Sequence, residues 1–367
     1  SHQDNHSQST YQYDALARLT QQSTTFNGAI NGTITKVLQT AYHANSQVRQ
    51  KTDPEGHQTN YFYDGAGKLN QLGIQSAGSI VVNEYEGLLP KTITYPGGIQ
   101  RQHEYDGLSR LKRILVSDSA STPQMDYQYQ FDVVGNILQK NTQQGNFTYQ
   151  YDNAYRLTRA DQPNSLGQQR YTYDGNGNRT QHTHTLDSLS TTKNYSYDNQ
   201  QALTGILSTL NDVTTIINQT YDNNGALTSD GTLTYHYNSF ARLAEISDSS
   251  DTVATYTYDP YGRRISKTVD STTTYFLYDD TGAGLVGEYT ATGELIRGYK
   301  YQPTGAYTTD PVALKTPSAN QTVGQPTAYE YSFYQNDHLG TPQRLMQING
   351  ATVWQGEYDA FGNITET

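Results

Sequence analysis

The sequence contains no cysteine, and it is poor in several other residues that anchor compact domains. Its 367 residues include one Trp, two Met and 8 Phe, and Asp, Glu, Lys and Arg together make up only 16%. The absence of cysteine excludes disulfide bonds and thiolate chemistry but leaves the redox compartment open. Hydrophobic residues other than Gly account for 34% of the chain, so we expect a thin core.

Basic charge and long apolar runs are also scarce. The net charge is −11, so the sequence offers no electrostatic footprint for nucleic acid or anionic lipid, and we predict neither partner. No apolar run approaches the roughly 18 residues of a membrane-spanning helix, so we predict no membrane insertion. Because the chain starts at Ser1 without Met or a signal-like segment, we expect a soluble fragment of a longer protein.

Tyrosine, by contrast, is abundant, with 33 copies, and it recurs in a pattern. An aromatic residue followed by Asp, and then by a short turn, returns at intervals of about 22 residues, which is typical of a repeat protein. Helical periodicity is absent. The Tyr–Asp pairs to which we assign the repeat are Tyr13–Asp14, Tyr63–Asp64, Tyr105–Asp106, Tyr151–Asp152, Tyr173–Asp174, Tyr197–Asp198, Tyr221–Asp222 and Tyr258–Asp259.

One unit is predicted to be a β-hairpin. In the copy that runs from Tyr171 to Asn178, Tyr171 and Tyr173 lie on one face of a strand because side chains alternate with period two. The strand should end at Asp174, whose carboxylate can accept backbone N–H bonds, while Gly and Asn residues supply positive φ. Alternating residues after the turn predict the returning strand.

The fold class follows from the length of the unit. About 22 residues allow two short strands and two turns but no ordinary helix. We therefore predict an all-β protein, a long ribbon of antiparallel hairpins with roughly 24 strands in its regular part. Strand twist should curl the ribbon into a spiral or a hollow shell. The excess of Tyr over Phe predicts rings whose hydroxyls reach water or a polar partner. A propeller or a two-sheet sandwich is the alternative fold.

The rhythm of the repeat divides the chain. We predict a flexible N-terminal segment at 1–10, the hairpin array at 11–301 and a loop-rich connection at 302–333, which contains a stretch rich in Pro and Thr. A distinct C-terminal segment occupies 334–367. Its notable residues are Asp337, His338, Gly340 and Pro342, then Trp354, Tyr358, Asp359, Phe361 and Gly362.

The repeats, the Asp-His-Leu-Gly-Thr-Pro stretch and the terminal Tyr-Asp-Ala-Phe-Gly together resemble the Rhs/YD-repeat proteins. That group includes bacterial Rhs polymorphic toxins, the C subunits of Tc toxins, and teneurins. The resemblance covers roughly residues 11 to 363. It implies a β-sheet shell that encloses a C-terminal toxic polypeptide or, in teneurins, serves adhesion. It also implies a secreted, cell-surface or delivered effector.

The sequence departs from the toxin branch at one place. That branch carries an Asp-Pro-x-Gly-Leu motif for self-cleavage after the shell, and this sequence reaches Thr367 without it. The stretches 53–56 and 259–262 read Asp-Pro-x-Gly but lack the final Leu, so we interpret them as turns, and the Asp-Pro at 310–311 lacks the Gly as well. No catalytic residue is carried over.

Other candidate sites are weak. The stretch 282–287 reads Gly-x-Gly-x-x-Gly, but no helix is expected to follow, so we predict no nucleotide site. Asp337 and His338 are expected to be hydrogen-bonding structural groups rather than an acid–base pair. The His residues are scattered and the acidic turns lack a ligand set of the right spacing, so we predict no metal and no cofactor.

The function predicted from sequence is structural and not enzymatic. We expect a shell that encloses and shields a C-terminal cargo polypeptide of the longer protein. The alternative is an adhesive or carbohydrate-binding module, because a stripe of Tyr rings can stack on sugars as well as on neighbouring hairpins.

Overall fold

The structure is a computed structural model that describes residues 2–29, 32–163, 166–282, 284–303, 310–319 and 327–366. Within these ranges the protein consists of 34 β-strands and one 3₁₀ turn at Pro96–Gly98, without an α-helix. The prediction of an all-β hairpin ribbon is therefore confirmed. Between Tyr42 and Tyr278 lie strands β4 to β27, close to the number expected for the regular part.

The strands form two large sheets. Sheet 1 has 20 strands and sheet 2 has 14. Sheet 1 contains β1 (His2–Gln3), β2 (Ser7–Tyr13), β3 (Leu19–Ala29), β4 (Gly32–Tyr42), β5 (Val48–Thr52), β6 (Gln58–Tyr63), β7 (Leu69–Ile74), β8 (Gly78–Glu86), β9 (Leu89–Thr94), β10 (Gln100–Tyr105), β11 (Leu111–Ser117), β12 (Pro123–Phe131), β13 (Ile137–Thr142), β14 (Gly145–Tyr151), β15 (Leu157–Asp161), β16 (Gln168–Tyr173), β17 (Arg179–Leu186), β18 (Leu189–Tyr197), β19 (Leu203–Leu210) and β20 (Val213–Asn218). Sheet 2 contains β21 (Thr220–Tyr221), β22 (Leu227–Ser229), β23 (Thr234–Tyr237), β24 (Leu243–Ser247), β25 (Thr252–Tyr258), β26 (Arg264–Val269), β27 (Thr272–Asp279), β28 (Gly284–Thr290), β29 (Leu295–Tyr301), β30 (Pro311–Pro317), β31 (Tyr329–Asn336), β32 (Pro342–Gln347), β33 (Thr352–Tyr358) and β34 (Ile364–Glu366).

Within each sheet, every strand pairs antiparallel with the next strand in the sequence. The register of the pair β16–β17 is representative, with Tyr171 opposite His182 and a bulge at Tyr173 opposite Arg179. The ribbon is interrupted once, because β20 and β21 belong to different sheets. Only Gln219 separates the two strands, and β20 pairs with β19 whereas β21 pairs with β22.

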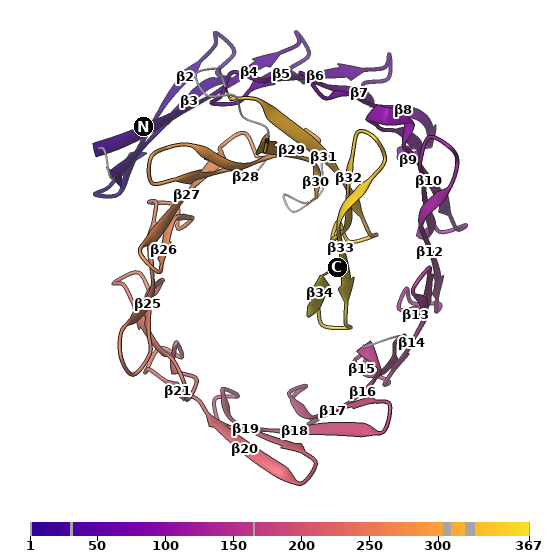
Figure 1. Cartoon of the computed structure of the whole chain (residues 1–367), viewed down its shortest axis with the longest axis vertical. Helices are drawn as coiled ribbons and strands as arrows, with labels where there is room; N and C mark the ends of the chain where they lie inside the picture. The colour runs from indigo at the N-terminus through magenta and orange to yellow at the C-terminus, as the bar shows by residue number, and fades with distance from the viewer. Residues whose placement is uncertain are drawn as a thin grey trace.

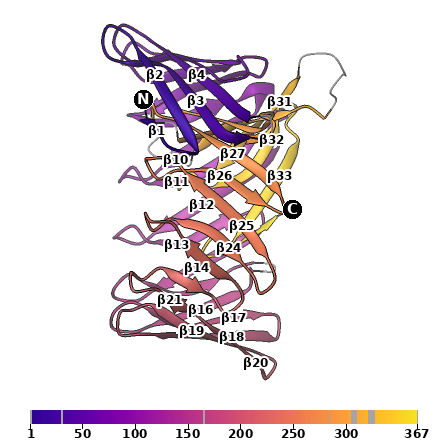
Figure 2. The same ribbon diagram turned by 90° about the vertical axis from the view of Figure 1, so that its left-hand side faces the viewer.

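The ribbon curls into a ring, and its C-terminal strands come to lie inside the curve (Figure 1). Strands β27 to β29 run along the inner side of the first strands, and β31 to β34 continue into the interior. Seen from the side, the strands lie across the wall, one below another (Figure 2). The two sheets do not close into a barrel, and the chain forms a spiral whose end overlaps its beginning.

The overlap creates two apolar cores between the layers. The larger one joins β6 to β12 with β30 to β32, and includes Ile114, Met125, Phe333 and Met346, all without exposed surface. The smaller one joins β3 and β4 with β26 to β29, with Phe26 packed against the ring of Tyr275 at 5.1 Å between centroids. A plain curved wall was expected from the repeat, so this second layer is an addition that the sequence pattern did not reveal.

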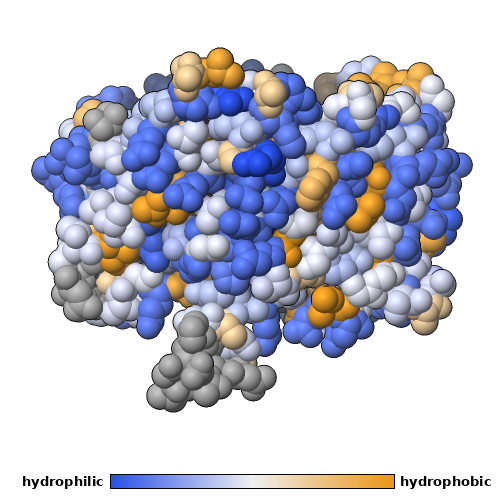
Figure 3. All heavy atoms as spheres, turned by 90° about the horizontal axis from the view of Figure 1, so that it is seen from above, coloured by the Kyte–Doolittle hydropathy of each residue, from blue (hydrophilic) through white to orange (hydrophobic). Residues whose placement is uncertain are grey.

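Elsewhere the wall is a single layer. From residue 172 to residue 253, all of which the structure describes, no residue is buried. Apolar side chains of β20 are largely exposed there, Val213 and Ile216 at 67% each. The face seen from above is mainly hydrophilic with scattered apolar side chains (Figure 3).

Two of the predicted segments contain β-strands. The stretch 302–333 was expected to be loop-rich, yet it contains β30 and the start of β31, whose apolar side chains pack in the larger core. Its residues 304–309 and 320–326 lie outside the described residues. Within 1–10, β1 and the start of β2 pair with each other. The division of the chain into four parts stays a prediction.

Candidate functional site

The turn of each repeat is organised by its aspartate. In the copy at Asp174, Oδ1 accepts the backbone N–H of Asn176 at 2.9 Å and that of Asn178 at 2.9 Å. The backbone closes the turn from Gly177 N–H to the Asp174 carbonyl at 3.2 Å. Both bonds to Oδ1 also form at Asp14, Asp64, Asp106, Asp132, Asp152, Asp198, Asp222, Asp337 and Asp359.

The third residue after the aspartate has positive φ. Gly177 has φ 93°, and Gly340 and Gly362 have φ 79° and 84°. Glycine is not obligatory, because Tyr155 (φ 60°) and Ala17 (φ 59°) fill the same position. In the fully described turn after Asp174 only Gly177 has positive φ, so the expectation is confirmed for Gly and is wrong for Asn at this turn.

The tyrosine of each pair binds the preceding hairpin. The Tyr173 hydroxyl donates to the backbone carbonyl of Leu157, at a distance of 2.6 Å. The acceptor is the first residue of the returning strand in the previous unit. The same bond joins Tyr42 to Leu19, Tyr63 to Val48, Tyr105 to Pro90, Tyr151 to Ile137, Tyr197 to Arg179, Tyr221 to Leu203, Tyr258 to Leu243, Tyr278 to Arg264 and Tyr358 to Pro342.

This bond explains the preference for Tyr over Phe. A phenylalanine would pack equally well but would leave the carbonyl without its donor. Burial raises the pKa of Tyr63 and of Tyr105 to about 12 each, so these hydroxyls remain protonated donors. The polar partner expected for the hydroxyls is thus the protein backbone. Tyr13 belongs to the first pair of the repeat, and its side chain is 59% exposed.

A basic residue completes the connection between units, and the sequence analysis did not identify it. Arg156, four residues after Asp152, donates from Nε to Asp152 Oδ2 at 2.7 Å and from Nη1 to the carbonyl of Asp174 at 3.0 Å. Its guanidinium also lies 4.8 Å from the centre of the Tyr173 ring. Arg18, Arg110, Arg242 and Arg263 stack in the same way on Tyr42, Phe131, Tyr258 and Tyr278. A recurring Arg at the fourth position after Asp or Asn was the available signal.

We call this set of contacts the hairpin clasp, namely the aspartate turn, the tyrosine bond to the previous unit and the arginine bridge to the next unit. The backbone N–H and the guanidinium of Arg156 lower the pKa of Asp152, and the amide of Asn178 lowers that of Asp174. The carboxylates are therefore charged at neutral pH and serve as acceptors. The chemistry of the clasp is cohesive, since its groups are all engaged with one another.

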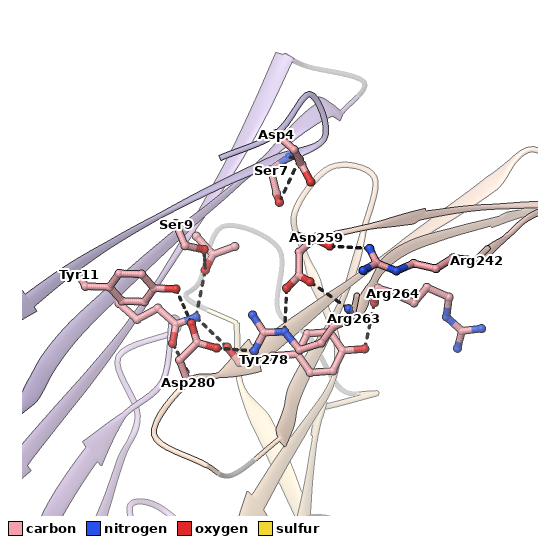
Figure 4. Close-up of polar contacts among 12 residues, drawn as sticks. Asp4, Ser7, Ser9, Tyr11, Arg242, Asp259, Arg263, Arg264, Tyr278 and Asp280 are labelled. Carbon is pink, nitrogen blue, oxygen red and sulfur yellow. Dashed lines mark hydrogen bonds and ion pairs between the residues drawn. The ribbon is translucent and has the colours of Figure 1, made fainter. Parts of the chain in front are cut away.

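The ring closes where β2 and β3 meet the end of β27, and this junction is polar (Figure 4). The Tyr11 hydroxyl donates to Asp280 Oδ2 at 2.5 Å, and Arg263 forms an ion pair with the same carboxylate. Gln22 donates from Nε2 to the Tyr278 carbonyl at 2.8 Å and accepts the Asp280 N–H at 2.9 Å. Strands more than 250 residues apart in the sequence are thereby joined.

A buried ion cluster lies beside this junction. Asp53, in the turn between β5 and β6, accepts Nζ of Lys300 at 2.7 Å and Nζ of Lys315 at 2.9 Å. Lys315 also contacts Glu55 at 3.2 Å, and its side chain is 1% exposed. Burial would raise the pKa of Asp53, but Lys300 and Lys315 hold it below its usual value. Two lysines of the inner layer are thus neutralised by carboxylates of the outer layer.

The Asp-His-Leu-Gly-Thr-Pro stretch docks on the inner side of the wall. Arg101 of β10 donates to the Asn336 carbonyl at 2.8 Å, and the His338 ring lies 4.7 Å from the Tyr129 ring. Burial lowers the pKa of His338, so the imidazole is neutral at pH 7. Asp337 is occupied by its own turn. His338, in contrast, packs on Tyr129 and its buried Nδ1 has no hydrogen-bond partner in the described part of the chain, so a structural role for the pair stays a prediction.

The last hairpin extends farthest into the interior. Trp354 of β33 faces Leu345 of β32 across the pair, and the Tyr358 hydroxyl donates to Pro342 at 2.7 Å. The Phe361 ring contacts Tyr171 at 4.9 Å between centroids, so this turn reaches the opposite part of the wall.

The weaker candidates are placed as follows. The stretch 53–56 is a turn closed by the Gly56 N–H and the Asp53 carbonyl at 2.9 Å, and 259–262 is closed in the same manner. The Gly-rich stretch 282–287 runs into β28, which begins at Gly284, so a strand and not a helix follows its first glycine. Ala283 lies outside the described residues. No group of acidic residues and histidines suited to a metal ion occurs in the described part of the chain.

Fold and clasp together define the class of the protein: a spiral shell of tyrosine–aspartate hairpins. The family profile described as "Teneurin YD-shell" matches residues 97–306, and that described as "RHS protein" matches residues 332–367. The chain belongs to the YD-shell family, a family of structural shells, as the Rhs/YD-repeat resemblance indicated.

Two curated relatives, one named as a nuclease and one as a deaminase toxin, are much longer than this chain. The chain is 28% identical over 199 residues to "tRNA nuclease WapA" of Bacillus subtilis, a match that covers 54% of this chain and 8% of that protein. It is 29% identical over 126 residues to "Double-stranded DNA deaminase toxin A" of Burkholderia cenocepacia, a match that covers 30% of this chain and 8% of that protein. The matches thus span less than a tenth of these relatives.

Solved structures show the same fold over nearly the whole chain. The TcdB2-TccC3-Cdc42 structure matches 98% of this chain and 20% of that chain, at a TM-score of 0.64 and 14% identity. A Tc holotoxin pore of Photorhabdus luminescens also matches 98% of this chain and 20% of that chain, with a TM-score of 0.62 and 15% identity. At these identities the likeness concerns the fold. In the described residues, no helix has the length and apolarity to span a membrane.

Proposed function

We propose that this shell encloses and shields a polypeptide attached beyond its C-terminal hairpin, and that the cargo is a toxin. The observation that carries the proposal is the position of β33 and β34 inside the curve (Figure 1). The contact of Phe361 with Tyr171 fixes this hairpin against the inner side of the wall. A polypeptide continuing from β34 would begin in the interior, where the wall stands between it and proteases.

The relatives support the toxin part of the proposal. Proteins named as a tRNA nuclease and a DNA deaminase toxin share the shell sequence but are far longer than it. We infer that such activities belong to the cargo and that the shell is not itself an enzyme. Because one of those relatives is named as a toxin, we also infer that the longer protein is secreted or delivered.

The adhesive alternative has less support. A sugar-binding stripe needs ring faces and hydroxyls that are free to contact a ligand. The hydroxyls of Tyr63, Tyr173 and Tyr258 donate to backbone carbonyls, and Arg156 covers one face of the Tyr173 ring. These tyrosines serve cohesion between hairpins.

Protease protection tests the proposal. An unstructured reporter peptide with trypsin sites is fused after Thr367 in one protein and before Ser1 in another. We expect the C-terminal reporter to be cleaved at least about tenfold more slowly, because local opening must precede its cleavage. Equal cleavage rates, with both fusions folded by circular dichroism, would refute encapsulation.

A further inference from the structure

The inner side of the single-layered wall can be identified from contacts. Phe361, on the hairpin inside the ring, touches Tyr171 of β16, so the face of sheet 1 that carries Tyr171 points inward. Directly opposed residues of neighbouring strands share a face. Tyr171 is opposite His182, and His182 is opposite Lys193, so Lys193 of β18 also points inward.

Sheet 2 can be oriented in the same way. Leu277 of β27 packs outward in the core with Phe26, so its neighbour Phe276 points inward because side chains alternate. The guanidinium of Arg264 lies 5.1 Å from the Phe276 ring and 5.5 Å from the Tyr256 ring. Tyr256 is opposite Lys267, which therefore points inward as well.

Four cations thus point to the inner side, Arg179 and Lys193 on sheet 1 and Arg264 and Lys267 on sheet 2, and we call this set the inner basic face. Arg179 belongs to it because its guanidinium lies 4.9 Å from both the Tyr195 ring and the Phe361 ring. Between residues 168 and 269 every Asp and Glu lies in a turn or loop except Glu245. Glu245 is opposite Thr255, which precedes the inward-pointing Tyr256. Because side chains alternate along a strand, Thr255 and Glu245 point outward.

In the described part of the chain the four inner cations form no ion pair, whereas outer-face arginines such as Arg113 and Arg159 do. Among the described residues, no ion pair joins the four cations of the inner basic face to a carboxylate. On the outer face, Arg113 is paired with Asp126 at 2.8 Å and Arg159 with Asp161 at 2.8 Å. Among strands β16 to β26, all within the described residues, the outer face carries a single cation, Arg170, which donates to Gln168. In a chain of net charge −11, the excess of uncompensated cations on the inner face marks a surface for an anionic partner.

An acidic segment of the chain already lies against the edge of this face. Residues 352–367 contain Glu357, Asp359 and Glu366 but no Lys or Arg. Their hairpin lies inside the ring, with Phe361 between Tyr171 and Arg179. Burial, together with the charges of Arg179 and Lys193, lowers the pKa of His182 to about 4, and the charge of Asp359 opposes this shift.

We propose that the inner basic face binds an acidic, extended polypeptide segment and thereby holds the start of the enclosed cargo against the wall. This inference rests on the proposed function and names the chemistry of its partner. Unpaired cations supply the attraction, and the half-buried Thr191, Tyr195 and Tyr256 beside them carry hydroxyls that can bond to a peptide backbone. Acidic turns at the edges of the wall repel a free polyanion, which favours a segment that belongs to the same chain.

The test compares charge-matched variants of the full chain. Fluorescein-labelled oligoglutamate, oligolysine and single-stranded DNA are titrated at low ionic strength and followed by anisotropy. We expect oligoglutamate to bind more tightly than oligolysine. The variant Lys193→Gln/Lys267→Gln should weaken oligoglutamate binding about fivefold, given the small worth of exposed ion pairs. Arg159→Gln/Arg170→Gln removes two outer-face charges and should leave it unchanged.

Three results would overturn the inference. The first is an equal loss of oligoglutamate affinity in both variants, which indicates non-specific attraction. The second is tighter binding of oligolysine than of oligoglutamate. The third is DNA binding that is tighter than oligoglutamate binding and is lost in Lys193→Gln/Lys267→Gln. Thermal unfolding of both variants at the wild-type temperature confirms that the folds are intact. Because protease protection of the fused reporter does not depend on its charge, encapsulation can hold when the inner basic face fails.

Discussion

Two regions of the shell are built from the same hairpin but held together differently. Strands β6 to β12 are covered by β30 to β32 and share a dry core with Phe333 and Met346. Strands β17 to β24 have water on both sides and no buried residue. In the first region hydrophobic burial dominates, and in the second the hairpin clasp and the ladder hydrogen bonds must suffice. The repeat therefore provides a wall that is stable without a core, and the overlap adds a core where the spiral has to stay closed.

The largest effect is expected from the double layer. Phe333→Ala removes a fully buried ring that packs against Tyr95 and should lower the free energy of unfolding by about 3–5 kcal/mol. The matched change Ile216→Ala, on the exposed single layer, should stay within about 0.5 kcal/mol. Urea unfolding of both variants measures the difference. Equal effects would mean that the layers do not pack as described.

The buried ion cluster should come next. Asp53→Asn leaves Lys315 without its main counter-charge and should cost about 3 kcal/mol, because an uncompensated buried charge is expensive. Asp161→Asn, at an ion pair on the outer face, should cost below about 1 kcal/mol. Urea midpoints of both variants provide the comparison.

Protonation of Asp53 in acid should destabilise the wild-type protein in the same way as the change Asp53→Asn. The folded-state pKa of Asp53 is lowered, so its stabilising contribution is complete above the unfolded value of about 4. As the pH falls through the lower folded-state pKa, the contribution is lost. The difference in free energy of unfolding between the wild type and Asp53→Asn should therefore be constant near neutral pH and become smaller in acid. A gap that widens below pH 4 would contradict the assignment.

A turn in the single layer should matter less. Gly177→Val forces a β-branched side chain to φ 93° and should cost about 1–2 kcal/mol. Tyr155 and Ala17 occupy the same turn position, so the shell tolerates such strain at some units. Thermal unfolding measures the change, and an unaltered transition would argue against the positive φ at this position.

The smallest effect isolates the tyrosine bond of the clasp. Tyr173→Phe removes the hydroxyl that donates to Leu157 and should cost about 1 kcal/mol. The reverse change, Phe131→Tyr, supplies a hydroxyl where the repeat lacks one and should be neutral or stabilising. If Tyr173→Phe raises stability, the hydroxyl bond is not part of what holds the hairpins together.

The sequence predicted what is local in this fold. Tyr171, Tyr173 and Asp174 contain the strand, its face and the turn, because alternation and carboxylate capping act over a few residues. The bridge from Arg156 to the next unit was missed, although Arg18 and Arg110 repeat its spacing. The packing of Phe333 on the first turn of the spiral could not be read from the sequence, since no local pattern says which distant wall an apolar strand will meet.

The position of the C-terminal hairpin inside the ring is the central claim, and the lack of native cysteine permits a direct measurement. Cysteines introduced at Tyr171 and Phe361, whose rings lie 4.9 Å apart, are treated with a short bismaleimide and analysed for intramolecular cross-linking. The pair Phe361 and Leu207, with Leu207 on the outer face, serves as the control. The account predicts rapid cross-linking of the first pair and none of the second. Cross-linking of the control alone, or no intramolecular product from either pair, would contradict it.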